Sequence, residues 1–254
     1  MKQNDLDQIA AWFEQYVGSF LKGDPVTQNC LKSRYDHTLR TCREMAYLTE
    51  QMTLDRPARL VAQTIALLHD IGRFEQFVHY GTFFDHVSID HGLLGAKILR
   101  QADVLSHLSP EEQTMIQIAV KYHNRRTLPE DLPQSQVLFA ELIRDADKLD
   151  IFESAIAYYQ ERQSNPQNLG WEIELQDEPS CSPEVVNALL SGRQIEHCHL
   201  QTIHDMQLAQ LAWIYDVNFA PTYQRLEERQ VLKRLIDLLP EDAPSGCIHE
   251  RVTE

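Results

Sequence analysis

The sequence predicts an all-α fold. Its 254 residues contain only 9 glycines and 11 prolines. Alternating polar and apolar residues, which are typical of β-strands, are scarce, and apolar residues recur at helical spacing instead. A chain of this length with 43% hydrophobic residues can bury a large core. We therefore expect a helical bundle followed by a mainly helical C-terminal extension.

The first two expected helices each carry one buried stripe. Over residues 29–54, apolar and small residues recur at steps of three and four. Pro57 suits a first helical turn and begins a second helix, which runs to Leu68. We expect Gly72 to end that helix and a loop to follow from Phe74 to Asp85.

Two further helices are predicted from their first residues. Ser88 or Asp90 is expected to cap a helix that continues through Arg100. In residues 109–112 a capping serine precedes a proline and two glutamates, which favour the positive end of a helix dipole. This helix is expected to run to about His123.

Residues 136–160 are apolar on nearly all sides, which predicts a central, buried helix. We place a domain boundary after it, with a core at 1–163 and an extension at 164–254. The extension begins with a polar, acidic segment that includes an expected short hairpin around 171–175. Further helices are expected from residue 182 and around 203–217 and 222–239.

Composition excludes several classes of function. The 23 basic and 38 acidic residues give a net charge of −15, which disfavours long nucleic acids and membrane surfaces. The sequence has neither a stretch that is apolar enough to span a membrane nor the pattern of a signal peptide at its start. We therefore expect a cytoplasmic protein. The five cysteines are scattered and predict neither a disulfide framework nor a cysteine zinc site.

The chemistry is carried by polar residues within apolar helices. His69 and Asp70 are adjacent at the end of such a helix, although a capping aspartate beside a core histidine gives the same pattern. Similar residues in apolar surroundings are His37, His91, His123, Asp145, Asp147 and Asp150. A buried carboxylate without a partner costs several kcal/mol, so the aspartates need either a basic side chain or a metal ion. Asp145 and Asp147 are about 200° apart around their helix and cannot both face one site.

The order of these residues resembles the HD superfamily of metal-dependent phosphohydrolases. The resemblance covers about residues 30–155 and rests on His37, the His69-Asp70 doublet in ALLHDIGR, and the late segment Ala146-Asp147-Lys148-Leu149. It implies an all-α core in which the first histidine, the doublet and the final aspartate bind a divalent metal. The final ligand follows an alanine in the family, so Asp147 takes that role and Asp145 does not.

Two more histidines indicate a binuclear member of the superfamily. His91 in His-Gly-Leu-Leu-Gly-Ala and His123 at the end of an apolar helix are similar to the extra histidines of those members. The resemblance then implies two metals, with Asp70 as the bridging ligand and catalytic residue. The metal ligands would be His37, His69, Asp70, His91, His123 and Asp147. Imidazoles with two carboxylates suit Mn, Fe, Co, Ni or Zn better than Mg.

The resemblance implies cleavage of a small phosphate ester, with a nucleotide as the favoured class, by a hydroxide that bridges the metals. We expect Arg73 and Lys148 to bind the substrate phosphate, although a surface pair between Arg73 and Glu75 is an equal alternative. Two other functions stay open. One is a di-iron oxygenase that cleaves a C–C or C–P bond, and the other is a non-catalytic nucleotide sensor. The sequence also leaves open whether 164–254 covers the site, binds a partner or forms a homodimer face.

Overall fold

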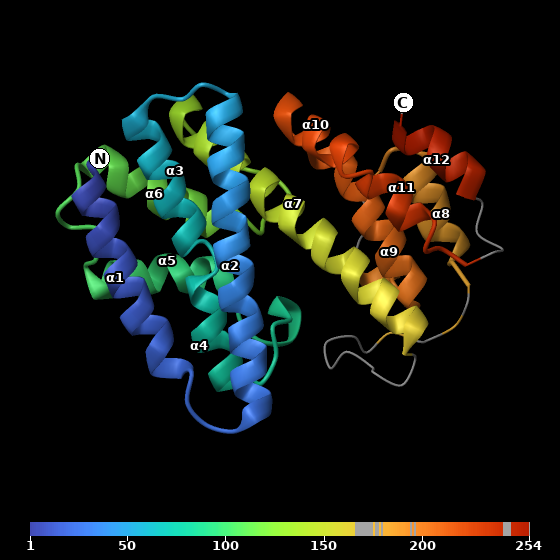
Figure 1. Ribbon diagram of the computed structural model, residues 1–254, viewed down its shortest axis with the longest axis horizontal. Helices are drawn as coiled ribbons and strands as arrows, with labels where there is room; N and C mark the ends of the chain where they lie inside the picture. Colours follow the sequence, from blue (N-terminus) through green and yellow to red (C-terminus); the bar gives the residue numbers. More distant parts are fainter. Residues whose placement is uncertain are drawn as a thin grey trace. The chain divides into compact units, whose positions relative to one another are not determined.

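A computed structural model describes residues 1–165, 175, 178, 180–193, 195, 197–240 and 245–253. The chain divides into two compact units, Met1–Asp150 and Ile151–Glu254, and each unit is considered by itself. The division falls inside helix α7 (Gln134–Ser164), which contributes to both units (Figure 1). The domain boundary expected after residue 163 stays a prediction.

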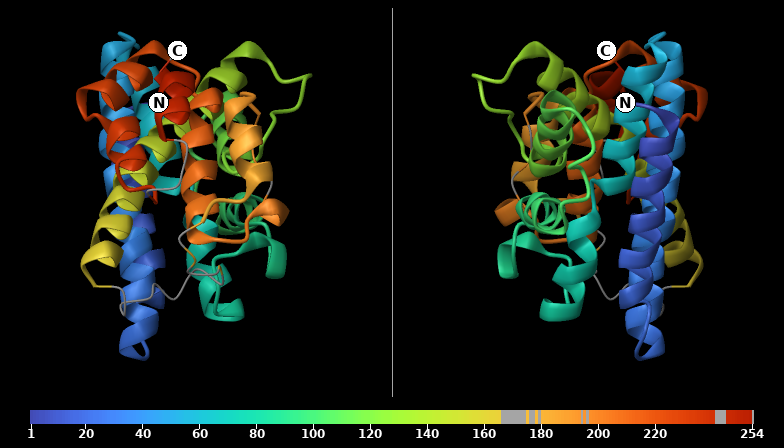
Figure 2. Two further views of the ribbon diagram at one scale, coloured as in Figure 1. Left: turned by 90° about the vertical axis from the view of Figure 1, so that its right-hand side faces the viewer. Right: turned by 90° about the vertical axis from the view of Figure 1, so that its left-hand side faces the viewer.

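The first unit is a helical bundle in which the two longest complete helices, α1 and α2, pack against the shorter helices α3 and α4. Helices α3 and α4 each pack against both α1 and α2, and α5 packs against α4 and α6 (Figure 1). The connection from α6 to α7 projects from this unit (Figure 2). The complete helices are α1 (Gln3–Phe20), α2 (Pro25–Gln51), α3 (Arg56–Leu68), α4 (Ile71–Tyr80), α5 (His91–Ala102) and α6 (Pro110–Tyr122), with a short 3-10 helix η1 (Asp85–Val87).

Several helices begin where the sequence predicts. Asp90 caps α5, because its carboxylate accepts a hydrogen bond of 2.9 Å from the backbone N–H of Leu93. Ser109 and Glu112 form a reciprocal capping box at the start of α6. His123 directly follows the last residue of that helix.

The loop expected from Phe74 to Asp85 is wrong over its first half. Helix α4 begins at Ile71, and it ends at Gly81, whose φ of 68° is left-handed. Gly72 therefore lies inside a helix and does not end one. Its lack of a side chain serves packing, because a Cβ there would lie 2.2 Å from the carbonyl oxygen of His91 and 2.8 Å from the backbone nitrogen of Gly95.

The regular elements in the described part of the second unit are also helices. Phe152 on α7 packs edge-on against Trp213, and Tyr159 donates a hydrogen bond of 2.8 Å to Gln210. Apart from Leu175, the hairpin expected around 171–175 lies outside the described residues. The remaining helices are α8 (Pro183–Leu190), η2 (His197–His199), α9 (Ile203–Ala212), η3 (Trp213–Asp216), α10 (Ala220–Glu228), α11 (Val231–Ile236) and α12 (Ser245–Thr253).

The prediction of an all-α fold is confirmed, since the described part of the chain contains no strand. Among the same residues, no helix combines the length and the apolar character needed to cross a membrane.

Substitution of Gly72 tests the close approach of α4 and α5. We expect Gly72→Ala to lower the free energy of unfolding by about 1–3 kcal/mol, because the added methyl group meets backbone atoms that cannot rotate away. The control is Gly18→Ala on the exposed side of α1, where a Cβ meets nothing within 4 Å. Gly18→Ala should raise the free energy of unfolding by about 0.5–1 kcal/mol. Urea unfolding measures both, and equal stability of Gly72→Ala and wild type would contradict the packing argument.

Candidate metal centre

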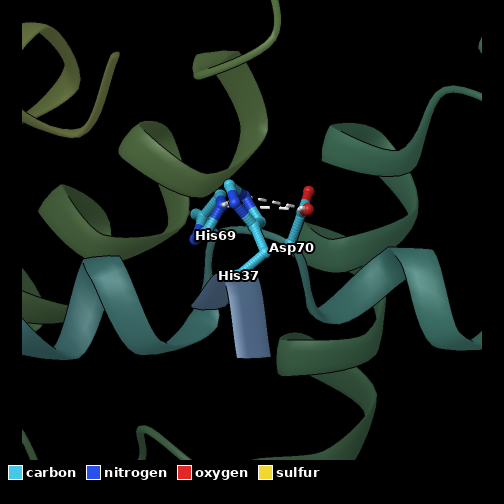
Figure 3. A group of neighbouring side chains, drawn as sticks. All are labelled: His37, His69 and Asp70. Atoms are coloured by element: carbon cyan, nitrogen blue, oxygen red, sulfur yellow. Dashed lines mark hydrogen bonds and ion pairs between the residues drawn. The ribbon is translucent and has the colours of Figure 1, made fainter. Parts of the chain in front are cut away.

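All six residues that the resemblance assigns as metal ligands converge in the first unit. Figure 3 shows three of them, with the imidazoles of His37 and His69 and the carboxylate of Asp70 facing one another. Five of the six are buried, and the sixth is half-buried. They come from six places in the fold: His37 from α2, His69 from the end of α3, Asp70 from the junction before α4, His91 from the start of α5, His123 from the end of α6 and Asp147 from α7.

The first group of donor atoms surrounds one point. Nε2 of His37 and Nε2 of His69 are 3.3 Å apart. Oδ2 of Asp70 lies 3.7 Å from the first nitrogen and 3.8 Å from the second. Oδ1 of Asp147 lies 3.1 Å and 3.8 Å from the same two atoms. Two nitrogens and two oxygens therefore share a space of the size that a metal ion occupies.

A second group forms on the other oxygen of Asp70. Nε2 of His91 and Nε2 of His123 are 3.0 Å apart, and Oδ1 of Asp70 lies 3.3 Å and 3.5 Å from them. Each oxygen of Asp70 thus faces its own pair of imidazoles. This is the arrangement required of a carboxylate that bridges two cations.

Two of the histidines are oriented by the helices that they end. Nδ1 of His69 donates to the carbonyl oxygen of Ala66, and Nδ1 of His123 donates to that of Val120, each at 2.8 Å. The last carbonyls of a helix have no partner within the helix, so an imidazole placed three residues later can satisfy one of them. In both cases Nε2 is left to point into the site.

The other two histidines are oriented by carboxylates. Nδ1 of His37 donates to Asp150 at 2.7 Å, and Asp150 is held in turn by two hydrogen bonds from Arg40, at 2.6 and 3.0 Å. Nδ1 of His91 donates to Asp85 at 2.8 Å. A carboxylate behind a histidine fixes the ring and makes its free nitrogen a stronger ligand.

These hydrogen bonds fit the residues to a metal. A neutral imidazole that donates from Nδ1 presents a lone pair at Nε2, so two neutral rings with close Nε2 atoms repel each other unless a proton or a metal ion lies between them. Within the part of the chain that the structure describes, Oδ1 of Asp147 is buried and accepts no hydrogen bond. Two ligand atoms that are each about 2.1 Å from a metal lie about 3.0–3.4 Å apart, which is close to the separations observed.

The pKa values of the residues in the centre show which of them are charged. Burial by itself would raise the pKa of the Asp70 carboxyl, but His69, His123 and Arg73 hold it well below its usual range. Burial lowers the pKa of His91 to about 4. Burial also opposes protonation of His37, whose neighbouring carboxylates nevertheless raise its pKa to about 9. The carboxylates are therefore ionised and in need of positive charge.

The structure places Arg73 beside the centre, paired with Asp70 and Asp85 and not with Glu75, and its role as a phosphate contact stays a prediction. Its guanidinium Nε is 3.5 Å from Asp70, and Nη1 is 3.1 Å from Asp85. Nη1 also donates to Gln76 and to the carbonyl of Phe83. Lys148 follows Asp147 on α7 and is half-buried. Its role as a substrate contact stays a prediction.

Sequence reasoning missed Asp85, which connects several parts of the centre. Its carboxylate accepts hydrogen bonds from His91, Arg73, Gln76 at 2.9 Å and Asn124 at 3.0 Å. It reaches them from η1, six residues before His91, where no helical spacing links the two. Asp150 was visible in the sequence as a buried carboxylate one turn after Asp147, but the sequence did not show which histidine it orients.

Comparisons with known proteins agree with this geometry. The model of the HD domain family matches residues 34–151, a range that contains all six converging residues. No curated protein and no solved structure matches the chain.

Removal of the charge behind His37 should weaken metal binding without removing a ligand. We expect Asp150→Asn to lower the affinity for Co²⁺ about 10-fold to 100-fold, because His37 loses the ionised acceptor that fixes its ring. Calorimetry and the visible absorption of bound Co²⁺ report the change. The control is Asp36→Asn, which removes a carboxylate from an exposed ion pair with Lys32 on α2. A Co²⁺ affinity of Asp150→Asn equal to that of the control would contradict this role.

Proposed function

Since residues 34–151 match the model of the HD domain family, whose members are generally metal-dependent phosphohydrolases, we propose that this chain is a binuclear metal-dependent phosphohydrolase. Its substrate is a small phosphate ester, and a nucleotide is the favoured class. The proposal is carried by one observation, that the two oxygens of Asp70 face two separate pairs of imidazoles.

The six converging residues would hold two divalent transition metals, with Mn, Fe, Co, Ni and Zn as the candidates. Such a metal pair lowers the pKa of a bound water and neutralises charge on a phosphoryl group. Four imidazoles and two carboxylates form a donor set that suits these ions, and the ring orientations described above leave one nitrogen of each histidine for them.

The protein's own side chains support a substrate site on one side of this centre. Asp147 is 18% exposed and Arg73 17% exposed, whereas the four histidines are nearly inaccessible. A phosphate would therefore approach where Asp147 and Arg73 reach solvent. Nη2 of Arg73 makes no hydrogen bond within the described part of the chain, so it remains for a phosphate oxygen.

Asp85 would position both halves of the site. It orients His91 among the metal ligands and holds Nη1 of Arg73 at the substrate side. A shared acceptor of this kind keeps the distance between the phosphate contact and the metal ligands constant, and that constancy favours one geometry of attack. No serine or cysteine nucleophile is needed.

Asp70→Ala tests the proposal. We expect metal analysis to find two transition-metal ions per chain in the wild type and at most one in Asp70→Ala, because both positions use Asp70. Turnover of a panel of phosphate esters should fall about 1,000-fold or more, which corresponds to several kcal/mol of lost stabilisation. Asp7→Ala, on the exposed face of α1, is the control and should retain both metal and turnover.

Two outcomes would overturn the proposal. If the reconstituted wild type binds no transition metal, the centre does not hold one, and a metal-dependent reaction is excluded. If the wild type binds two irons and consumes O₂ with substrate, the reaction is an oxygenation.

A further inference from the structure

A second arginine meets Arg73 at one buried aromatic residue. Arg73 donates a hydrogen bond from Nη1 to the backbone carbonyl of Phe83. The guanidinium carbon of Arg34 lies over the ring of the same residue, 4.4 Å from its centroid. That ring is itself fixed, because Phe83 is buried and stacks on Phe77 at 4.5 Å. Two guanidinium groups are thus anchored on one rigid residue.

Both arginines lie one helical turn from a residue of the metal centre. Arg34 precedes His37 by three residues on α2, and Arg73 follows Asp70 by three residues at the start of α4. His37 and Asp70 are themselves 3.7 Å apart. Residues three apart on a helix are neighbours on its surface, so both guanidinium groups lie near the same edge of the centre.

The electrostatics agree with this proximity. Burial is the main cause that lowers the pKa of Arg73, and the positive charge of Arg34 lowers it further. The two guanidinium groups therefore lie close enough for their charges to interact.

We propose that Arg34 is a second phosphate-binding residue and that the Arg34–Arg73 pair selects phosphate monoesters over diesters. This inference rests on the proposed function. Each planar guanidinium can grip two oxygens of a phosphate. The terminal group of a monoester offers three oxygens that are not esterified, whereas a diester offers two. A site with two arginines beside a metal centre matches the larger number of oxygens and the second negative charge of the monoester.

Inorganic phosphate is the direct probe of the pair. In calorimetry on protein loaded with Mn²⁺, we expect Arg34→Gln to weaken phosphate binding about tenfold or more, as the loss of a charge-assisted contact implies. Metal content should not change, because Arg34 is not among the six converging residues. Arg43→Gln is the matched control, since it removes the same charge from an exposed position on the same helix. Arg34→Met keeps a long apolar stem over Phe83 and replaces the glutamine variant if that variant does not fold.

Turnover tests the choice of ester. We expect the wild type to have a higher kcat/KM on the monoester 4-nitrophenyl phosphate than on the diester bis(4-nitrophenyl) phosphate. Arg34→Gln should lose about tenfold on the monoester and much less on the diester.

The outcomes separate this inference from the proposed function. Equal phosphate affinity in Arg34→Gln and wild type, with metal bound in both, would overturn the role of Arg34 while the hydrolase proposal stands. A wild type that binds metal but prefers the diester would overturn the substrate class alone. Absence of metal binding would instead overturn the proposed function.

Discussion

The structure depends on one electrostatic constraint, the meeting of four imidazole nitrogens and two carboxylates in a buried space. Each histidine donates from Nδ1 to a fixed acceptor, so each directs a lone pair from Nε2 toward the others. Lone pairs 3.0 Å and 3.3 Å apart, next to ionised carboxylates, repel one another unless a proton or a metal ion lies between them. A bundle can maintain this arrangement only if the helices are held firmly and either protons or metal ions relieve the repulsion.

The bundle holds these side chains in place because it brings the ends of several helices together. His69, Asp70, His91 and His123 all lie at or beside the terminus of a helix. A side chain at a helix end can use the backbone groups that the helix leaves unpaired, and His69 and His123 do so in the same way. The absence of a side chain at Gly72 lets α4 approach the backbone of α5, which carries His91. The packing of the helices in this unit therefore also determines where the histidines of the centre lie.

The sequence was sufficient for the features that appear within a single segment. Polar residues in apolar helices conflict with burial, and that conflict marked His37, Asp147 and the others before any contact was known. The prediction of a loop was wrong over its first half because Gly72 was expected to end a helix. Gly72 instead lies within α4, where the lack of a side chain allows close packing against α5. Asp85 could not be predicted, since it reaches His91, Gln76 and Arg73 from a 3-10 helix at spacings that mark no common helix face. Arg34 could not be predicted, since Phe83, over which it lies, comes from a distant segment.

Charge decides how an acidic protein can bind a phosphate. The whole chain carries −15. The centre gathers four carboxylates, Asp70, Asp85, Asp147 and Asp150, two of which pair with Arg73 and one with Arg40, while Arg34 lies nearby over Phe83. With neutral imidazoles these groups carry one net negative charge, and protonation of His37, whose pKa is raised to about 9, brings the total to zero. In neither state does the metal-free centre carry an excess of positive charge that would attract an anion. Two divalent cations would change the local charge to three positive. Because a local field is dominated by its nearest charges, the same residues offer a phosphate no net attraction before metal binds and would attract it afterwards, so we expect metal binding to come first.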